Sequence, residues 1–356
     1  MSHLDNITIS ITLAATPAQA AGFGNVLILV DEASNSLNGN RVVTYTNATD
    51  AASDQAAGYI TSGVLKAVQT AFAQRPAPAR VKLGYVDTSG GETYAQGYAA
   101  VKLVDTDFYG VCLDSRTAAV IAAVAAAVEA DRRLLVAQSA DADWLTTGGV
   151  PSGFTGIDGN ERTAIVYHDT ATEWADVAWA CNRLAFDPDS QSAAWDCPVK
   201  GVADYATDLT QAQADFADTN NANNKGTAGT YGGEVFYIDP GKSLAGRPIA
   251  DLISADWLET RLEEALANLK VTRALAGEKI PITKAGQREV MAELEALFKQ
   301  GVDAGHFVEG QTEVTPQAIT STDISLQRLR FTARAQLVSS MRIVTFTINL
   351  GTSALE

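Results

Sequence analysis

The chain of 356 residues is poor in the residues that build common metal sites and disulfide frameworks. Its histidines are His3, His168 and His306, and its cysteines are Cys112, Cys181 and Cys197. None of them falls into an HxxxH, HExxH or CxxC spacing, which excludes the usual zinc motifs. An odd number of cysteines also argues against a disulfide framework, so we expect folding in a reducing cytoplasm.

Positive charge is also scarce. The chain has 26 Lys and Arg against 42 Asp and Glu, a net charge of −16, and no run of basic residues. Such a chain does not hold nucleic acid through its net field. No apolar stretch reaches the ~20 residues of a membrane span, and residues 1–5 lack the basic and apolar regions of a signal peptide. We therefore expect no direct nucleic-acid binding, no membrane insertion and no leader.

Two glycine-containing segments are similar to nucleotide-binding motifs but depart from them. "GFGN" (residues 22–25) precedes an apolar strand-like run, whereas the dinucleotide fingerprint follows a strand and has a third glycine. "FYIDPGKS" (residues 236–243) ends like a Walker A loop, but Phe236 replaces the first glycine. Asp239 and Pro240 interrupt the row of backbone N–H groups that phosphates need. We interpret these segments as an entry turn and a Pro-Gly turn, with no cofactor.

The remaining reactive side chains carry no catalytic pattern. His168 ends a strand-like run without a nucleophile elbow, so we expect a satisfied strand-end histidine. Cys112 and Cys181 fall on apolar faces and are expected in the core, whereas Cys197 precedes Pro198 and is the thiol expected to be exposed. The acidic residues are scattered, and sequence alone assembles no acid–base pair from them. A soluble α/β enzyme with an unrecognised acid–base site therefore stays open as an alternative.

The first half of the chain alternates between strand-like and helix-like segments. Strand-like apolar runs are residues 25–30, 81–86, 108–113, 134–137 and 164–167, and helix-like segments are residues 50–74, 115–131 and 170–185. Ser115 is a predicted N-cap, and Thr170 with Glu173 forms a predicted capping box. Continuous apolar strands between helices predict an α/β domain with buried, largely parallel pairing.

The second half of the chain has a different pattern of predicted elements. Residues 219–233 are rich in Asn and Gly and are predicted to form an exposed loop before a strand at residues 234–239. Amphipathic helices are predicted at residues 254–274 and 283–300, with Gly301 as the C′ residue of the second. The apolar face of the first helix carries Trp257, Leu258, Leu262, Leu266 and Leu269; that of the second carries Val290, Met291, Leu294, Leu297 and Phe298. Strand-like segments follow.

Both ends of the chain read as single strands with an apolar face. Residues 6–13 alternate, with Ile7, Ile9, Ile11 and Leu13 on one face, and residues 342–350 place Val344, Phe346, Ile348 and Leu350 on one face. Each strand needs cover for that face and partners for its backbone. They could pair with each other or with an internal sheet, or they could be exchanged with neighbouring subunits by β-augmentation. The linker at residues 14–18 fits an outward-reaching arm.

Taken in order, these segments resemble a contractile tail sheath protein of a bacteriophage or phage-like particle. The likeness is carried by "ITISITLAATPAQ", by "ERTAIVYHDTATEWADVAWACNRLAFDP", and by "DWLETRLEEALANL", "KIPITKAGQREVMAELEALFKQGVDAGHF" and "RFTARAQLVSSMRIVTFTINL". It covers most of the chain, although residues 30–245 match by layout alone. The resemblance implies an α/β plus α+β fold in two domains, with N- and C-terminal strand arms exchanged between neighbours.

The implied domains are an arm and linker at residues 1–21, an outer α/β domain at 22–245, a tube-proximal α+β domain at 246–338, and a second arm at 339–356. The resemblance further implies a structural role and no enzyme activity. Such subunits stack as six-fold rings around a tail tube and contract to drive it through a bacterial envelope.

The implied partners are further copies of the chain, the tail tube protein, and the baseplate and tail terminator proteins. The implied location of the protein is the virion, after assembly in the bacterial cytoplasm. Lys284, Arg288 and Lys299 are implied tube contacts. A tail tube protein is disfavoured as an alternative, since it would be smaller and dominated by β-structure.

Overall fold

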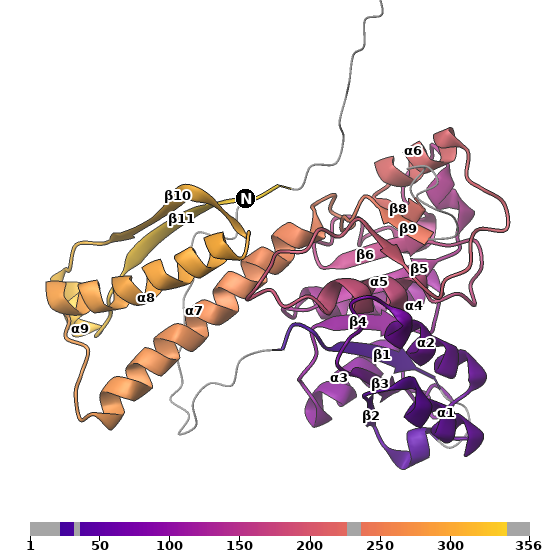
Figure 1. Ribbon diagram of the computed structural model, residues 1–356, viewed down its shortest axis with the longest axis horizontal. Helices are drawn as coiled ribbons and strands as arrows, with labels where there is room; N and C mark the ends of the chain where they lie inside the picture. Colours follow the sequence, from indigo (N-terminus) through magenta and orange to yellow (C-terminus); the bar gives the residue numbers. More distant parts are fainter. Residues whose placement is uncertain (1–21, 32–35, 226–235, 340–356) are drawn as a thin grey trace, which may run out of the picture.

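The described strands form a nine-stranded mixed sheet and a separate two-stranded one (Figure 1). The computed structural model describes residues 22–31, 36–225 and 236–339. The large sheet has the order β2-β3-β1-β4-β5-β6-β8-β9-β7, in which β3, β1, β4, β5, β6 and β8 are parallel. Strand bounds are β1 Val26–Val30, β2 Val42–Tyr45, β3 Val81–Tyr85, β4 Gly110–Leu113, β5 Leu134–Ser139, β6 Thr163–Tyr167, β7 Cys197–Val199, β8 Ala222–Lys225, β9 Phe236–Asp239, β10 Phe307–Pro316 and β11 Phe331–Leu337.

Helices cover both faces of the large sheet. α2 and α5 pack together on one face, and α3 and α4 pack together on the other (Figure 1). Helix bounds are α1 Ala48–Ala56, α2 Ser62–Ala73, α3 Tyr94–Val104, α4 Ala118–Glu129, α5 Ala175–Leu184, α6 Gln211–Thr219, α7 Ile249–Leu275, α8 Lys284–Asp303 and α9 Ser321–Ser325, with 3-10 turns η2 Ser36–Gly39, η3 Ala142–Leu145 and η4 Ser152–Phe154. Strands such as β1 are buried along their whole length, which confirms the predicted α/β layout.

Three helix predictions in the first half are wrong in detail. The helix predicted at residues 50–74 is two helices, α1 and α2, separated at Gly58, whose φ of 79° ends the first helix. α4 has Thr117 and not Ser115 at its N-cap position, and the Thr117 side chain makes no capping hydrogen bond. α5 begins at Ala175, so the predicted Thr170–Glu173 capping box does not form. Instead the side chain of Gln138, on β5, accepts the N–H of Ala175 at 2.9 Å, and sequence spacing does not reveal such a distant cap.

Part of the predicted Asn-rich loop is a buried strand, which is a further correction. Residues 222–225 form β8, parallel to β6. Asn223 is fully buried, and its amide donates to the carbonyls of Ile165 (2.9 Å) and Lys242 (2.8 Å). Its Oδ1 accepts two further backbone N–H groups. The side chain is therefore fully hydrogen-bonded inside the sheet, and this lets a polar residue occupy a core position. Residues 226–235 lie outside the described chain.

The second half is built around two long helices and a hairpin at one end of the molecule (Figure 1). α7 starts five residues earlier than predicted, at Ile249, and runs to Leu275. α8 continues through Gly301, so the prediction that Gly301 is the C′ residue is wrong. A Cβ at Gly301 would lie 2.5 Å from the Phe307 ring and 2.9 Å from Trp257. The glycine therefore allows close packing, and Gly305, with a φ of 80°, is the residue that follows the helix in the left-handed conformation.

Candidate assembly surfaces

The carboxyl edge of the large sheet is where doubly wound folds commonly bind ligands, at the point where strand order reverses. Asp31 follows β1 and Asp114 follows β4 at this point. Asp114 accepts the hydroxyl of Tyr94 and, at 2.8 Å, the N–H of Asp31. Thr88 donates its hydroxyl to Asp31. Burial raises the pKa of Asp114. These polar groups bond to one another and form a structural joint between β1, β4 and α3.

The segment similar to a Walker A loop is a turn after β9, as predicted. The N–H groups of Gly241 and Lys242 donate to Asn223 Oδ1 at 2.8 and 2.9 Å. In a phosphate-binding loop such groups face the ligand. Here the buried side chain of Asn223 accepts both of these N–H groups. Among the described residues, no group of three or more His, Cys, Asp or Glu could hold a metal ion.

All three thiols are buried. Cys112 and Cys181 lie in the core, as predicted. The prediction that Cys197 is exposed is wrong: it is 1% exposed, because the pairing of β7 with β9 turns Cys197 and Val199 inward and Pro198 outward. Burial raises the pKa of the Cys197 thiol to about 12. A thiol with so high a pKa is a poor nucleophile at neutral pH.

His168 is fully buried at the end of β6 with both ring nitrogens bonded. Its Nδ1 accepts the N–H of Thr170 at 3.1 Å, and its Nε2 lies 3.0 Å from the carbonyl oxygen of Ala203. With Nδ1 accepting, Nε2 carries the proton and donates to that carbonyl. The prediction of a satisfied strand-end histidine is confirmed.

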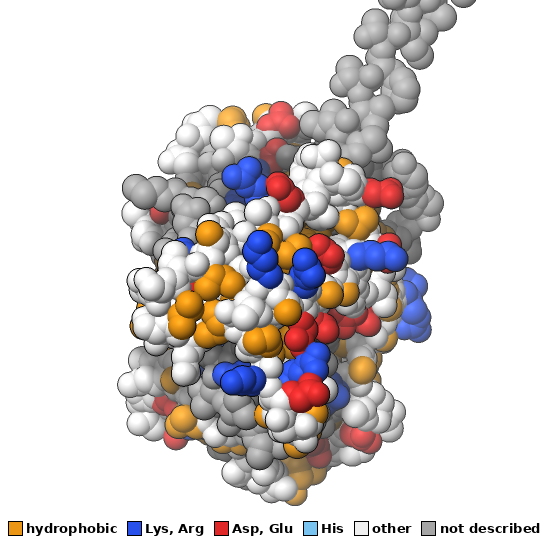
Figure 2. Space-filling model, turned by 90° about the vertical axis from the view of Figure 1, so that its left-hand side faces the viewer, with side chains coloured by type: hydrophobic (Ala, Val, Ile, Leu, Met, Phe, Trp, Pro, Cys, Tyr) orange, Lys and Arg blue, Asp and Glu red, His pale blue; other side chains and the backbone are white. Residues whose placement is uncertain are grey.

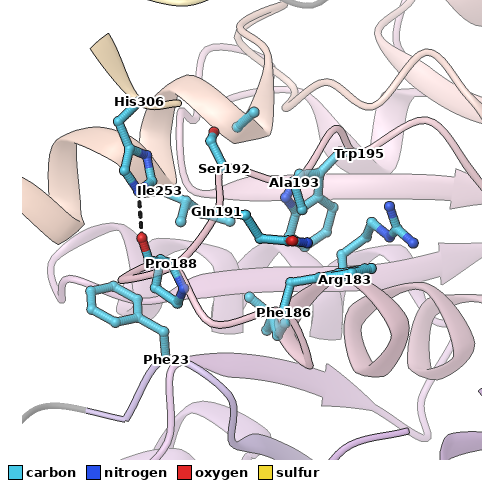
Figure 3. Close-up of a pocket in the computed structure, with 12 residues that line it drawn as sticks. Phe23, Arg183, Phe186, Pro188, Gln191, Ser192, Ala193, Trp195, Ile253 and His306 are labelled. Atoms are coloured by element: carbon cyan, nitrogen blue, oxygen red, sulfur yellow. Dashed lines mark hydrogen bonds between the residues drawn. The ribbon is translucent and has the colours of Figure 1, made fainter. Parts of the chain in front are cut away.

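A second buried histidine, His306, joins three segments of the chain (Figure 3). Its Nε2 lies 2.7 Å from the carbonyl oxygen of Pro188, and its Nδ1 lies 2.7 Å from the hydroxyl of Ser254 on α7. Beside it is a cavity of about 20 Å³ that is lined in part by Phe23 and Ile253, room for about one water molecule. Burial lowers the pKa of His306. This joint connects α7 and the start of β10 to the loop after α5.

A buried ion pair holds α7 against the large sheet. Arg162 donates to both oxygens of Asp256 at 2.6 Å, and the hydroxyl of Tyr109 donates to Asp256 at 2.7 Å. Asp256 is 3% exposed. Sequence reasoning missed this contact, since Arg162 lies 94 positions away. The available signal was an acidic residue four positions after Leu252, on the apolar face of a helix.

The hairpin of β10 and β11 is a two-stranded ribbon whose side chains are mostly exposed. Its antiparallel register pairs Glu313 with Arg334 and Thr315 with Thr332, and most of its side chains are exposed. Packing on α8 is confined to one side, where the Phe298 and Phe307 rings lie 5.7 Å apart. Within the described chain neither strand pairs with a third. Both edges of the ribbon therefore present unpaired backbone groups, the arrangement that favours addition of a strand.

The outer face of the ribbon is polar and hollowed. A hollow of about 290 Å³ is lined by Glu313, Thr315, Gln317, Thr332 and Arg334. Gln317 donates to the Thr332 hydroxyl at 2.6 Å across the two strands. This face carries hydrogen-bonding groups and no apolar stripe, so we do not expect it to pack into a core.

The implied tube-contact residues share one exposed stripe of α8. Lys284, Arg288 and Lys299 are all exposed. Lys284 and Arg288 are four positions apart, about one turn of helix. Arg288 and Lys299 are eleven positions apart, about three turns. The opposite face of α8 carries Val290 and Leu294, which are buried. The implied strand residues Ile7, Ile9, Ile11, Leu13, Val344, Phe346, Ile348 and Leu350 lie outside the described residues.

The chain shares its fold with solved structures at low sequence identity. No protein-family profile and no curated protein sequence matches it. Solved structures do match, and they share the fold of contractile tail sheath proteins. In the described part of the chain, no helix is both long enough and apolar enough to cross a membrane.

Three of these structures illustrate the likeness. A chain of the six-fold symmetrised baseplate of the anti-feeding prophage matches with a TM-score of 0.66 and 13% identity, over 98% of this chain and 100% of that chain. A chain of the contracted PVC sheath complex matches at 0.63 and 12%, over 98% of both chains. A sheath tail protein from Listeria innocua matches at 0.53 and 10%, over 91% of this chain and 97% of that one. These matches confirm the resemblance at the level of fold.

Proposed function

We propose that this chain is a structural subunit of a contractile tail sheath, in a bacteriophage or phage-like particle. The observation that carries the proposal is that no other described strand pairs with either edge of the β10–β11 hairpin. A two-stranded hairpin is marginally stable alone and needs further strands or a helix against it; here α8 supports one face, and the two edges remain available for added strands. The shared fold supports the same role. In this role the protein has no catalytic activity and needs no cofactor.

The missing strands would come from neighbouring subunits. Residues 6–13 and 342–350 each alternate apolar and polar side chains over strand length. Added to the two edges, one arm from each of two neighbours would turn the ribbon into a four-stranded sheet. Each arm would contribute backbone pairing to one edge of the ribbon. Repeated through the assembly, this exchange links every subunit to its neighbours.

In the proposed arrangement, residues 22–245 form the outer domain and residues 246–338 face the tail tube. Lys284, Arg288 and Lys299 would contact the tube. Lys284 is the first residue of α8, where a cation is unfavourable for the helix itself. A role in binding explains that placement better than helix stability does. The further partners would be the baseplate and tail terminator proteins.

The subunits would stack as six-fold rings around the tube, assembled in the bacterial cytoplasm and kept in the virion. On contraction each subunit would rotate and move outward while the exchanged arms keep the mesh connected. The energy would be stored in the assembly itself, so no nucleotide hydrolysis is needed. The turn formed by Gly241 and Lys242, whose N–H groups are bonded to Asn223, agrees with this.

Negative-stain microscopy of the concentrated full-length protein tests the proposal. A sheath subunit gives rings or tubes, alone or with its tube protein. The rival, a soluble α/β enzyme, gives discrete particles at every concentration. Discrete particles in the presence of the tube protein would overturn the sheath role.

A further inference from the structure

The residue just before the sheet body and the residue just before the hairpin lie on either side of Pro188 (Figure 3). Phe23 is three positions before β1, and His306 is the residue before β10. Both are buried, and both line the cavity of about 20 Å³ described above. Two residues that are far apart in the sequence therefore meet at one loop.

Phe23 is held by residues of other elements. The centroid of its ring lies 4.9 Å from that of Tyr109, the residue before β4, and 5.9 Å from Cζ of Arg261 on α7. A buried ring between a second ring and a guanidinium gains apolar burial and a cation–π contact. The segment before β1 is thereby fixed to α7 as well as to the large sheet.

Asp189 joins Arg261 to the hairpin side of the joint. It accepts Nε and Nη2 of Arg261 at 2.7 and 2.8 Å, and it accepts the indole N–H of Trp257 at 2.7 Å. Burial alone raises the pKa of this carboxyl, but hydrogen bonds from Arg261 and then from Trp257 outweigh burial and hold the pKa below its usual range. Asp189 is therefore ionised at neutral pH, and its two oxygens fix Arg261 and Trp257 relative to each other.

The hairpin foot completes this series of contacts. We use the name for His306 and Val338, the residues that flank the hairpin. Trp257 stacks on the His306 ring with centroids 4.6 Å apart, and the carbonyl of His306 accepts the N–H of Val338 at 3.0 Å. Contacts thus run without interruption from Phe23 to the hairpin foot.

These contacts lie beneath the surface of the hairpin end of the molecule. Figure 2 looks at that end and shows acidic, basic and hydrophobic side chains interspersed over it. By contrast, Trp257 is fully buried, His306 is 1% exposed and the Arg261 side chain is 12% exposed. Buried charges are screened by salt much less than exposed ones. A connection made by this joint should therefore persist at high salt.

We propose that Phe23 anchors the N-terminal arm, and that the joint at Asp189 couples this anchor to the hairpin foot, so that ordering of either one stabilises the other. The part played by the arm rests on the sheath role. In that role the arm at residues 1–21 leaves the subunit at Phe23, and the hairpin receives arms from neighbours. A strand added to the hairpin then stabilises the anchor of the same subunit, and an arm held by a neighbour stabilises the hairpin. A subunit bound on one side is thereby prepared to bind on the other.

The test is amide hydrogen exchange of the full-length protein, kept below the concentration at which it assembles. The reporters at the hairpin foot are the amides of His306 and Val338, which are both hydrogen-bonded. Phe23→Ala should speed their exchange at least about fivefold, the lower end of typical couplings between sites. The control is Phe154→Ala, which removes a fully buried ring of η4 in the sheet body. The control should leave exchange at the hairpin foot unchanged.

Coupling is reciprocal, which gives a second reading. The amides of Tyr109 and Gly110 both donate to the carbonyl of Asn25, two positions after Phe23. His306→Ala should speed the exchange of these two amides as well. Low and high salt should give the same result, because the joint is buried.

A double-mutant cycle tests whether Asp189 carries the coupling. Asp189→Asn removes the charge that holds Arg261 and keeps the size of the side chain. In that background, Phe23→Ala should have no further effect on exchange at the hairpin foot. An unchanged effect of Phe23→Ala in the Asp189→Asn protein would overturn the assigned role of Asp189.

Faster exchange at the hairpin foot in Phe23→Ala, without a change in Phe154→Ala, supports the proposal. Equal exchange in Phe23→Ala and the wild type overturns it. Equal acceleration by both variants also overturns it, because the effect would then be a general loss of stability. If Phe23→Ala does not fold, Phe23→Leu keeps most of the apolar volume, loses the aromatic contacts and is read in the same way.

Microscopy of the wild type judges the sheath role separately. Coupling in a protein that never forms rings or tubes removes the sheath role and leaves the coupled joint standing. Assembly in a protein without the coupling removes the joint as a coupling device and leaves the sheath role standing.

Discussion

Trp257 and His306 stack face to face, with ring centroids 4.6 Å apart and 16° between the ring planes. Trp257 is on α7, and its indole N–H donates to Asp189 at 2.7 Å. His306 precedes β10 and reaches the carbonyl of Pro188. The stack therefore connects the long helix and the hairpin to the same loop of the sheet body. It is the central contact of the joint between these parts.

Acid should weaken this joint. Burial lowers the pKa of folded His306, whereas an unfolded histidine titrates near 6.5. Between these two pKa values the unfolded chain binds more protons, so the free energy of unfolding decreases as pH falls through that window. We expect the thermal midpoint to drop between pH 7.5 and 5.5 by more in the wild type than in His306→Gln. Equal pH dependence in the two proteins would contradict this.

Gly301 should not tolerate a methyl group. Gly301→Ala places a Cβ within 2.5 Å of the Phe307 ring, and the overpacking should cost about 1–3 kcal/mol. The control is Gly63→Ala in α2, where the nearest atom lies 3.8 Å from the added Cβ. That change should stabilise the protein by up to about 1 kcal/mol. Urea denaturation measures both, and a stable Gly301→Ala would show that the helix and hairpin shift apart at little cost.

Deletion of residues 1–16 should leave a folded protein that cannot polymerise. The proposed N-terminal arm pairs with a neighbour, so its loss removes a link between subunits and none of the subunit core. Circular dichroism and negative-stain microscopy of the truncated chain check this. Loss of the fold would show that residues 6–13 pair within their own chain.

Phe346→Asp should give soluble subunits and no sheath. In the proposed exchange, Phe346 lies on the apolar face of the closing arm, where burial of one Phe contributes roughly 1.5–3 kcal/mol. A charge there is repeated at every identical contact of the assembly. Thr347→Asp adds the same charge on the other face and should disturb assembly less. Normal sheath from Phe346→Asp, seen by microscopy, would rule out an intersubunit strand, and an insoluble chain would place it in the subunit core.

Charge reversal at Arg288 should weaken tube binding and make it less sensitive to salt. Arg288 is exposed on the cationic stripe of α8, and an attraction between exposed charges is screened by salt. Lys270→Glu, on the exposed part of α7, makes the same change away from that stripe. Co-sedimentation with tube protein measures whether Arg288→Glu weakens binding more than Lys270→Glu does. Equal binding by Arg288→Glu and the wild type would leave the stripe as an ordinary solvated helix face.

The sequence predicts this fold best where burial is apolar. β1 and β6 are fully buried strands, and such strands read as continuous apolar runs. β8 could not be found in this way, because Asn223 is buried by satisfying its amide group and not by being apolar. The ion pair of Arg162 and Asp256 was equally hidden, since nothing local relates two residues 94 positions apart.

The candidate surfaces also differ in how far the sequence alone predicts them. The helix predicted at residues 283–300 contains Lys284, Arg288 and Lys299, and the structure shows all three exposed on α8. The pairing of Asp323 with Arg328 and Arg330 depends on a turn that places Gln327 at a φ of 52°. Alternation alone gives no sign of such a turn. The arm strands lie outside the described residues, so they stay predictions.

The hairpin edges that no described strand pairs also bear on how the protein is made. An unpaired strand edge accepts any extended chain, including the nascent or partly folded copies that surround a newly made subunit. Charged residues on the ribbon, such as Glu313 and Arg334, oppose unselective pairing but do not close the edges. In the proposed sheath role these edges are paired once the subunit is incorporated, so subunits that stay outside an assembly should be the ones that aggregate.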